Sequence, residues 1–378
     1  MRRLLYLTAD PGVPVLGHKG ASVHVRELCS AFAQAGIEVH LASPRIGAEG
    51  DQLPAPATLH GIASVAPKDH VPRTLRIAVQ AQARALMALC ARLGVDAIYE
   101  RFSLFTAAGV RAAAELGLRH VLEVNAPLRE EAARYRTLPH PEVAWLLESE
   151  VMVGTDRVFA VSEPLARALV ADGVDEAKIE VVPNGVAPER FAPPSRDPER
   201  FVVGFAGSMK PWHGIETLVD AVSRLPNVHL EVAGHGPLDD LLDALPAERV
   251  TRWGARPNAE VIGLMASWDV GLAPYAPAED FWFSPLKVLE YMAAGTCPVV
   301  SELGDAPELL GHGRRGVLVP AGDADALAAA IGAMTSDRDR ARRIGARARR
   351  WVAANRSWSV NARRALAALQ RRPVRSAA

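Results

Sequence analysis

The residues with the clearest chemical potential lie in the run Ser284–Gly295, which reads SPLKVLEYMAAG. A serine followed by proline is typical of a helix start, with the serine as cap and the proline at the first helical position. Such a start points free backbone N–H groups outward, and the partial positive charge there suits a phosphate. Glu290 lies two turns further along, and Gly295 ends the predicted helix. The run therefore predicts a phosphate site and a hydroxyl-accepting carboxylate in one crevice.

Three further loops that follow predicted strands contain glycine, and loops in this position bind ligands in doubly wound sheets. They are residues 17–22, 207–214 and 234–237. In the first loop, Gly17 and Gly20 allow close approach of the backbone, and Ser22 is predicted to cap the next helix. This loop lacks the three-glycine dinucleotide fingerprint, so a plain turn and a phosphate cradle both stay open for it.

Lysine is rare in this chain, and its positions are informative. Only five of the 43 Lys and Arg residues are lysines; Lys19 and Lys210 lie in two of these loops, and Lys287 lies in the Ser284–Gly295 run. A lysine is a mobile point charge that suits a diphosphate whose negative charge grows as it departs. We therefore predict diphosphate contacts, with a solvated surface role as the alternative for Lys210 and Lys287.

Short apolar runs alternate with longer amphipathic stretches along the chain, which is typical of parallel sheets covered by helices. Helices are expected between the strands, for example at 24–35, 324–334 and 359–370. The predicted strands are residues 4–8, 38–43, 97–99, 121–124, 158–162, 201–206, 229–233, 270–273, 297–300 and 316–319.

A turn-rich and proline-rich break divides this α/β series. The 378 residues, 49% of them hydrophobic, suffice for two domains with separate cores. We predict a first doubly wound domain over 1–185, a linker over 186–200 and a second over 201–357. Residues 358–378 are predicted as a final helix, with packing back on the first domain as one option, and then a tail.

Charge argues against nucleic acid as a partner. The formal net charge is zero, and no basic stretch contains interleaved aromatic residues. The arginine-rich stretch 338–350 includes Asp339 and follows Asp337, which favours a solvated helix face, with contact to an anionic membrane as the open alternative. No oligomeric state is indicated.

Cysteine, histidine and the first residues give three further expectations. Cys29, Cys90 and Cys297 are widely spaced in apolar segments, which predicts reduced structural thiols and a cytoplasmic protein. The apolar stretch 4–7 is too short for a signal peptide. The histidines lack metal-binding spacing with carboxylates, so no metal site is expected; those considered are His18, His120 and His235.

Taken in order, these loops resemble those of the GT-B glycosyltransferases, in particular the retaining family 4, also called glycosyl transferases group 1. The matching segments are the loop near Gly20, residues 182–186, the loop from Gly207, Gly234–Gly236, the Ser284–Gly295 run, residues 304–309 and residues 316–320. The resemblance implies two Rossmann-like domains facing a central cleft, with the acceptor on the first and the donor on the second. It also implies sugar transfer from a nucleotide-diphosphate sugar, UDP being the expected nucleotide, to a small-molecule, glycan or lipid-linked acceptor, without a bound metal.

The resemblance assigns a role to several positions. Glu290 matches the glutamate that accepts hydrogen bonds from the ribose hydroxyls, and Asn125 stands where relatives have a histidine facing the sugar. The resemblance also implies that the backbone of Ser284, Pro285 and Leu286, together with Gly234, contacts the diphosphate. It implies that Lys19 and Gly20 close over the phosphate from the first domain, and that Arg256 lies near the base.

The chain also departs from the family pattern. Trp282 takes the place of a glutamate that usually contacts the donor sugar, so Asp280 or Glu279 is expected to replace it. Ser208 and His213 take the places of an arginine and a lysine in the phosphate loop. The charge of those two is then expected from Lys210 and Lys287, which we predict as catalytic together with Asn125. His213 would act as a protonated cation or a neutral donor, or would pack beside Trp212.

Two acidic positions in the first half have a structural and a functional interpretation. Glu123 is predicted mainly to fix its loop, with action near the acceptor as the alternative. Glu100 and Arg101 end a strand, where they would meet an acceptor or form internal ion pairs.

The family mechanism implied for this chain is front-face displacement, in which the departing phosphate oxygen helps to deprotonate the acceptor. Closure about residues 184–200 would align the substrates and exclude water. Two alternatives stay open, a catalytically degenerate nucleotide-binding protein and a GT-B-like enzyme of another type, such as an epimerase or a non-glycosidic coupling enzyme.

Overall fold

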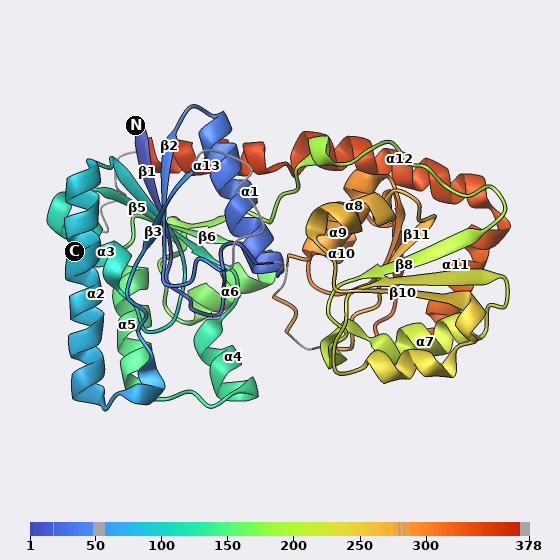
Figure 1. Ribbon diagram of the computed structural model, residues 1–378, viewed down its shortest axis with the longest axis horizontal. Coiled ribbons are helices and arrows are strands. Elements are labelled where there is room, and N and C mark those ends of the chain that lie inside the picture. The colour runs from blue at the N-terminus through green and yellow to red at the C-terminus, as the bar shows by residue number, and fades with distance from the viewer. Residues whose placement is uncertain (18, 48–56, 279, 283, 371–378) are drawn as a thin grey trace. The chain divides into compact units, whose positions relative to one another are not determined.

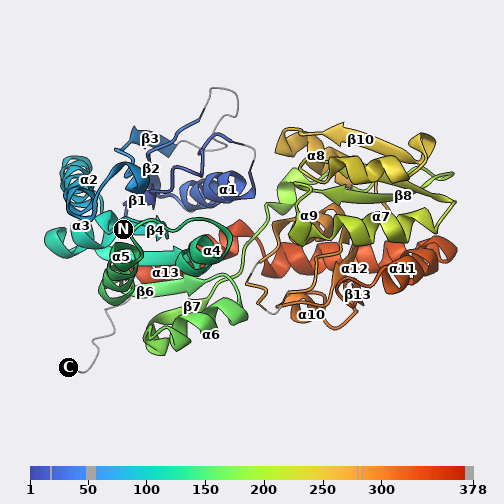
Figure 2. The same ribbon diagram turned by 90° about the horizontal axis from the view of Figure 1, so that it is seen from below.

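The computed structural model describes residues 1–17, 19–47, 57–278, 280–282 and 284–370. The chain forms two compact units. Unit 1 comprises Met1–Asn184, Trp282–Ser284 and the chain from Trp358, and unit 2 comprises Gly185–Phe281 and Pro285–Ser357. Each unit is a parallel sheet with helices on both faces (Figures 1 and 2).

Unit 1 has a seven-stranded sheet in the order β3-β2-β1-β4-β5-β6-β7, and every neighbouring pair is parallel. The strands are β1 Arg3–Thr8, β2 Glu38–Ser43, β3 Ala57–Gly61, β4 Ala97–Arg101, β5 Arg119–Val124, β6 Arg157–Ala160 and β7 Ile179–Val181. The central strands are almost wholly buried, because helices cover both faces.

Helices α2, α3 and α5 lie side by side on one face of this sheet, and α1 and α13 pack on the other (Figure 1). The helices of unit 1 are α1 Gly20–Gln34, α2 Pro72–Leu93, α3 Ala108–Leu116, α4 Leu128–Tyr135, α5 Pro141–Gly154, α6 Glu163–Ala171 and α13 Trp358–Gln370. The rings of Tyr6 in β1 and Phe32 in α1 pack against Tyr99, with centroids 5.4 and 5.5 Å away. This aromatic layer packs around Tyr99, the middle residue of β4.

Unit 2 has a six-stranded parallel sheet in the order β10-β9-β8-β11-β12-β13. Its strands are β8 Phe201–Ala206, β9 Val228–Ala233, β10 Val250–Gly254, β11 Val270–Ala273, β12 Cys297–Ser301 and β13 Val317–Val319. Its helices are α7 Ile215–Ser223, α8 Asn258–Met265, α9 Leu286–Ala294, α10 Ala306–Leu309, α11 Ala324–Ser336 and α12 Arg338–Asn355. Short 3-10 helices occupy Pro67–Asp69, Glu176–Lys178, Pro188–Arg190, Pro211–His213, Asp239–Ala244 and Ala247–Arg249.

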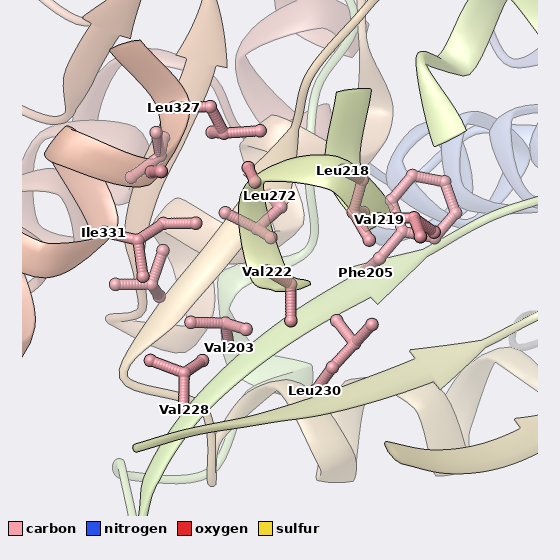
Figure 3. Close-up of a cluster of buried hydrophobic side chains, with 14 of the residues drawn as sticks. Val203, Phe205, Leu218, Val219, Val222, Val228, Leu230, Leu272, Leu327 and Ile331 are labelled. Carbon is pink, nitrogen blue, oxygen red and sulfur yellow. The ribbon is translucent and has the colours of Figure 1, made fainter. Parts of the chain in front are cut away.

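Alternate residues of β8 enter two separate hydrophobic cores. Val203 and Phe205 pack with α7 and α11 (Figure 3), while Val202 and Ala206 pack with α8, α9 and α12 on the opposite face. The ring of Phe205 therefore lies at the end of β8, where the strand meets the loop from Gly207.

The segment 186–200, predicted as a linker, belongs to unit 2 and is anchored there. Arg196 donates to the carbonyl oxygens of Trp268 (3.0 Å) and Gly295 (2.6 Å). Arg338 donates to the carbonyl oxygen of Pro198 (2.8 Å), and Arg349 to that of Phe191 (2.8 Å). These bonds disfavour a hinge spread over 186–200.

The arginine stretch 338–350 is therefore not simply a solvated face. Arg338 forms a bidentate pair with buried Asp269, at 2.8 and 2.9 Å, in addition to its carbonyl bonds. Arg347 donates to the carbonyl oxygen of Arg314 (3.1 Å). None of the helices within the described residues is long and apolar enough to cross a membrane.

Candidate active site

The loops after β8 and β9 meet backbone to backbone at the carboxyl edge of the unit 2 sheet. Gly207 has a φ of +136° and Gly234 a φ of +142°. A Cβ added to Gly234 would lie 2.0 Å from the carbonyl oxygen of Gly207, so a side chain does not fit there. The Gly207 amide donates to the carbonyl of Ala233 at 2.9 Å. The absence of a side chain at Gly234 thus allows the predicted phosphate loop to pack directly against the backbone after β9.

Helix α9 begins one residue later than predicted, at Leu286, with Pro285 as its cap. Ser284 was wrongly predicted as the cap, because its side chain has another partner. Its Oγ accepts a hydrogen bond from the amide of Asn184 (3.0 Å), and its carbonyl oxygen accepts one from the Asn184 side-chain amide (2.8 Å). The predicted end at Gly295 is confirmed, with a φ of +76°.

Lys287, in the first turn of α9, places its side-chain nitrogen, Nζ, in an aromatic pocket. Nζ lies 4.2 Å from the ring centroid of Phe205 and 5.5 Å from that of Tyr275. A Cβ added to Gly207 would lie 2.9 Å from Nζ, so the nitrogen borders the Gly207 loop. Nζ is buried and has no hydrogen-bond partner among the described residues. The solvated-surface alternative is therefore wrong for Lys287.

His213 lies beside this pocket as a neutral donor. Its Nδ1 donates to the carbonyl oxygen of Ser208. Burial, and then the positive charge of Lys287, lower the pKa of His213 to about 4, which excludes the protonated cation near pH 7. The ring also lies near Trp212, with centroids 5.9 Å apart. Ser208 is exposed, and Lys210 is partly buried at the cap of the Pro211–His213 turn.

Glu290 lies three residues after Lys287 and is partly exposed. Its Oε1 accepts a hydrogen bond from the side-chain amide of Asn258 at 3.0 Å. Asn258 is the first residue of α8, so the start of one helix holds the carboxylate of the next. Arg256 nearby in sequence is exposed; it donates to the carbonyl oxygen of Trp253 (2.9 Å) and pairs with Glu260 at 3.7 Å.

In unit 1, the predicted phosphate residues lie at the start of α1, which begins at Gly20 with Lys19 as its cap. Both are exposed, and the Lys19 ammonium donates to the carbonyl oxygen of Gly12 (3.1 Å). Ser22 was wrongly predicted as the cap; it lies inside the helix and is buried. His18 lies outside the described residues. Arg26 holds the preceding loop by donating to the carbonyl oxygens of Val15 (2.7 Å) and Gly17 (2.6 Å).

The Glu123 cluster, formed by Glu123 with its four donors, occupies the carboxyl end of β5. Glu123 is 4% exposed. Its carboxylate accepts from the Tyr99 hydroxyl (2.5 Å), Asn125 Nδ2 (2.5 Å), His24 Nε2 (2.9 Å) and Arg101 (3.2 Å). Burial alone would raise the pKa of Glu123, but His24, Arg101 and the Tyr99 hydrogen bond outweigh it and lower the pKa to about 2. The geometry matches the predicted loop-fixing role and orients Asn125.

Glu100, the neighbouring carboxylate, pairs internally. Its Oε2 lies 2.9 Å from Nε2 of His120, and both residues are at most 1% exposed. Glu100 is therefore inaccessible to an acceptor.

Trp282, which stands where relatives have a glutamate, belongs to unit 1, as does Ser284. The carbonyl oxygen of Trp282 accepts a hydrogen bond from the hydroxyl of Ser162 at 2.6 Å. Its side chain packs on the hydrophobic cluster formed with Leu122 and Leu165. Trp282 is thus a packing residue. Of its two expected replacements, Asp280 is exposed and Glu279 lies outside the described residues.

Several residues that build these sites were not predicted from the sequence; they are His24, Arg26, Tyr99, Asn184 and Asn258. Asn258 is the first residue of α8 and follows the cap position, Pro257, so its place in the sequence does not mark it as a capping residue. Within the described ranges, no three His, Cys, Asp or Glu side chains are grouped so that they could hold a metal ion.

Two family models match the chain. One, described as Glycosyltransferase Family 4, matches residues 18–190, and the other, described as Glycosyl transferases group 1, matches residues 200–337. A D-inositol 3-phosphate glycosyltransferase of Mycobacterium ulcerans is 30% identical over 279 residues, which are 68% of this chain and 59% of the relative. The chain thus spans less than two thirds of that relative's length.

Solved structures show the same fold at low sequence identity. A sucrose-phosphate synthase from Thermosynechococcus elongatus is 21% identical with a TM-score of 0.75, over 97% of this chain and 98% of its own. HepE of Anabaena, crystallised with UDP and glucose, is 18% identical with a TM-score of 0.71, over 97% and 98%. The two family models match both halves of the chain, and the structure has the two Rossmann-like units. The chain therefore belongs to the family 4, or group 1, glycosyltransferases of the GT-B fold.

Proposed function

We propose that the chain transfers a sugar from a nucleotide-diphosphate sugar to an acceptor hydroxyl, with retention of the anomeric configuration. The observation that supports this most is the Lys287 nitrogen, which has no hydrogen-bond partner in the described part of the chain and lies beside the Gly207 loop, one helical turn before Glu290. A nucleoside diphosphate needs positive charge and free backbone N–H groups at its phosphates, which a lysine and a helix start can supply. It also needs an acceptor for its ribose hydroxyls, which a carboxylate such as that of Glu290 can supply. We propose UDP as the nucleotide, and the UDP bound to HepE supports that choice.

In this proposal the unit 2 residues act on the diphosphate. Glu290, held by Asn258, accepts hydrogen bonds from the ribose hydroxyls. Lys287 and Lys210 neutralise the charge that grows on the diphosphate as its bond to the sugar breaks, which replaces the missing arginine and lysine of the loop without a metal. One such preorganised donor is typically worth about 3 kcal/mol of barrier.

Asn125 and the acceptor side belong to unit 1. We propose that Asn125, oriented by Glu123, contacts the donor sugar. The leaving phosphate oxygen takes the acceptor proton while the new glycosidic bond forms on the face that the diphosphate leaves. Acceptors in this proposal are small molecules, glycans or lipid-linked molecules.

The test combines binding and chemistry. Thermal-shift measurements with UDP, GDP, ADP and TDP should show one clear preference, and the corresponding nucleotide sugars should then give a glycoside whose anomeric configuration matches the donor. Absence of a shift with all four nucleotides would contradict the proposal.

A second candidate is a nucleotide-binding protein without transferase activity. It is favoured by Trp282, whose packing in unit 1 leaves no carboxylate at that position. Slow hydrolysis of the donor in the absence of acceptor would argue for an enzyme, and nucleotide binding with neither hydrolysis nor transfer would argue for this alternative.

A further inference from the structure

Lys287 has an environment that does not stabilise an ammonium ion. Its Nζ is buried, has no hydrogen-bond partner in the described parts of the chain and faces aromatic rings. Cation–π contact with Phe205 returns part of the lost hydration, but a buried cation without an anion remains costly. Burial lowers the pKa of Lys287 to about 7, although the charge of Glu290 acts in the opposite direction.

The groups around Nζ come from three neighbouring elements besides α9. From α9 itself, Glu290 lies three residues on and accepts from Asn258. The Pro211–His213 turn contributes the neutral ring of His213. The segment after β11 contributes Tyr275, whose burial raises the pKa of its hydroxyl and keeps it neutral. β8 contributes the uncharged ring of Phe205. None of these groups forms a hydrogen bond with Nζ within the described residues, so no anion lies in direct contact with it there.

We propose that Lys287 is a neutral amine in the ligand-free protein at pH 8 and takes up one proton when a nucleoside diphosphate binds. The ammonium ion then forms only together with its phosphate partner. The step adds a solvent proton to the Nζ lone pair and breaks no covalent bond. It rests on the proposed function, because the diphosphate must lie against this nitrogen.

The test is calorimetry of UDP binding at pH 8 in buffers with different ionisation enthalpies. The slope of observed enthalpy against buffer enthalpy gives the number of protons taken up. At this pH the terminal phosphate of UDP is fully ionised, since its second pKa is about 6. We expect close to one proton per UDP for the wild type.

Two variants separate Lys287 from other sources of proton uptake. Lys287→Arg is charged at every pH used, so it should bind UDP with almost no uptake. Lys210→Met, the matched control from the same site, should bind more weakly with unchanged uptake. If Lys287→Arg does not fold, as judged by circular dichroism, Lys287→Met serves as the second variant, and any binding it retains should likewise show no uptake.

Three outcomes would overturn the inference. UDP binding to the wild type without proton uptake would show that Lys287 is already charged. Undiminished uptake in the Lys287 variants would assign the proton to another group. Either result leaves the proposed function standing, whereas no binding of UDP, GDP, ADP or TDP at pH 6 to 8 overturns both.

Discussion

Glu123 in unit 1 and Lys287 in unit 2 both place a buried ionisable group at the carboxyl edge of a parallel sheet. Glu123 receives hydrogen bonds from four side chains, and its pKa is lowered to about 2, which favours the charged form. Lys287 has no hydrogen-bond partner among the described residues, and its pKa is lowered to about 7, which favours the neutral form. The difference teaches that burial alone does not mark a ligand site. The protein itself supplies the partners of Glu123, and we propose that a bound anion supplies the partner of Lys287.

The largest contrast is expected from Glu290, next to the incomplete site. Glu290→Ala should abolish sugar transfer, because the ribose loses its acceptor, while the fold stays intact because the side chain is partly exposed. A transfer assay with circular dichroism on the same sample measures both. Wild-type turnover in this variant would remove Glu290 from the site.

The Glu123 cluster should respond in the opposite way. Glu123→Ala leaves four buried or half-buried donors without an acceptor and should lower the free energy of unfolding by about 3–5 kcal/mol. Chemical denaturation measures this, with Asn125→Ala, which removes one donor only, as the matched control. A loss below about 1 kcal/mol would show that the cluster is not a structural centre.

The same cluster predicts a pH dependence. The pKa of Glu123 is lowered in the folded state, so its stabilisation is complete above the unfolded pKa of about 4.5 and is lost as pH falls toward 2. Glu123→Gln should therefore show a flatter loss of stability than the wild type between pH 5 and 2. Parallel curves would contradict the assignment.

Lys287 should give a pH dependence of its own. Between pH 7 and 10.5 the unfolded chain binds one proton more than the folded protein at this group, so its share of the stability rises with pH, by up to about 1.4 kcal/mol per pH unit. Denaturation of the wild type and Lys287→Met at pH 8 to 10 should differ by this slope. Lys210→Met should run parallel to the wild type, and a parallel Lys287→Met curve would show that Lys287 is not an isolated buried amine.

The smallest effect is expected at Asn258, which positions Glu290. Asn258→Ala removes one hydrogen bond to the carboxylate and should raise the KM for the donor about fivefold, as expected for about 1 kcal/mol. Asn258→Asp places a second carboxylate beside Glu290 and should raise the KM further. An unchanged KM in both variants would remove Asn258 from the site.

Much of the fold could be predicted because the buried strands are continuous apolar runs. The strands that the apolar pattern did not predict, β3, β7 and β10, are edge strands with no fully buried residue. These three strands are covered less and include polar residues, whereas the edge strand β13 is a continuous apolar run and was predicted.

The site could be predicted only in part. The Ser284–Gly295 run located Lys287 and Glu290 because local sequence sets a helix and its spacing. The cap at Ser284 was wrong because its partner, Asn184, lies 100 residues away in the chain. The donors to Glu123 come from α1, β4 and the end of β5, so only the folded chain brings them together.

The central claim is that Lys287 binds the diphosphate of the nucleotide. The ratio of the binding affinities for UDP and UMP tests this claim most directly. We predict that the wild type binds UDP far more tightly than UMP, and that Lys287→Met reduces this ratio at least tenfold without lowering the thermal stability of the ligand-free protein. An unchanged ratio in Lys287→Met would contradict the account.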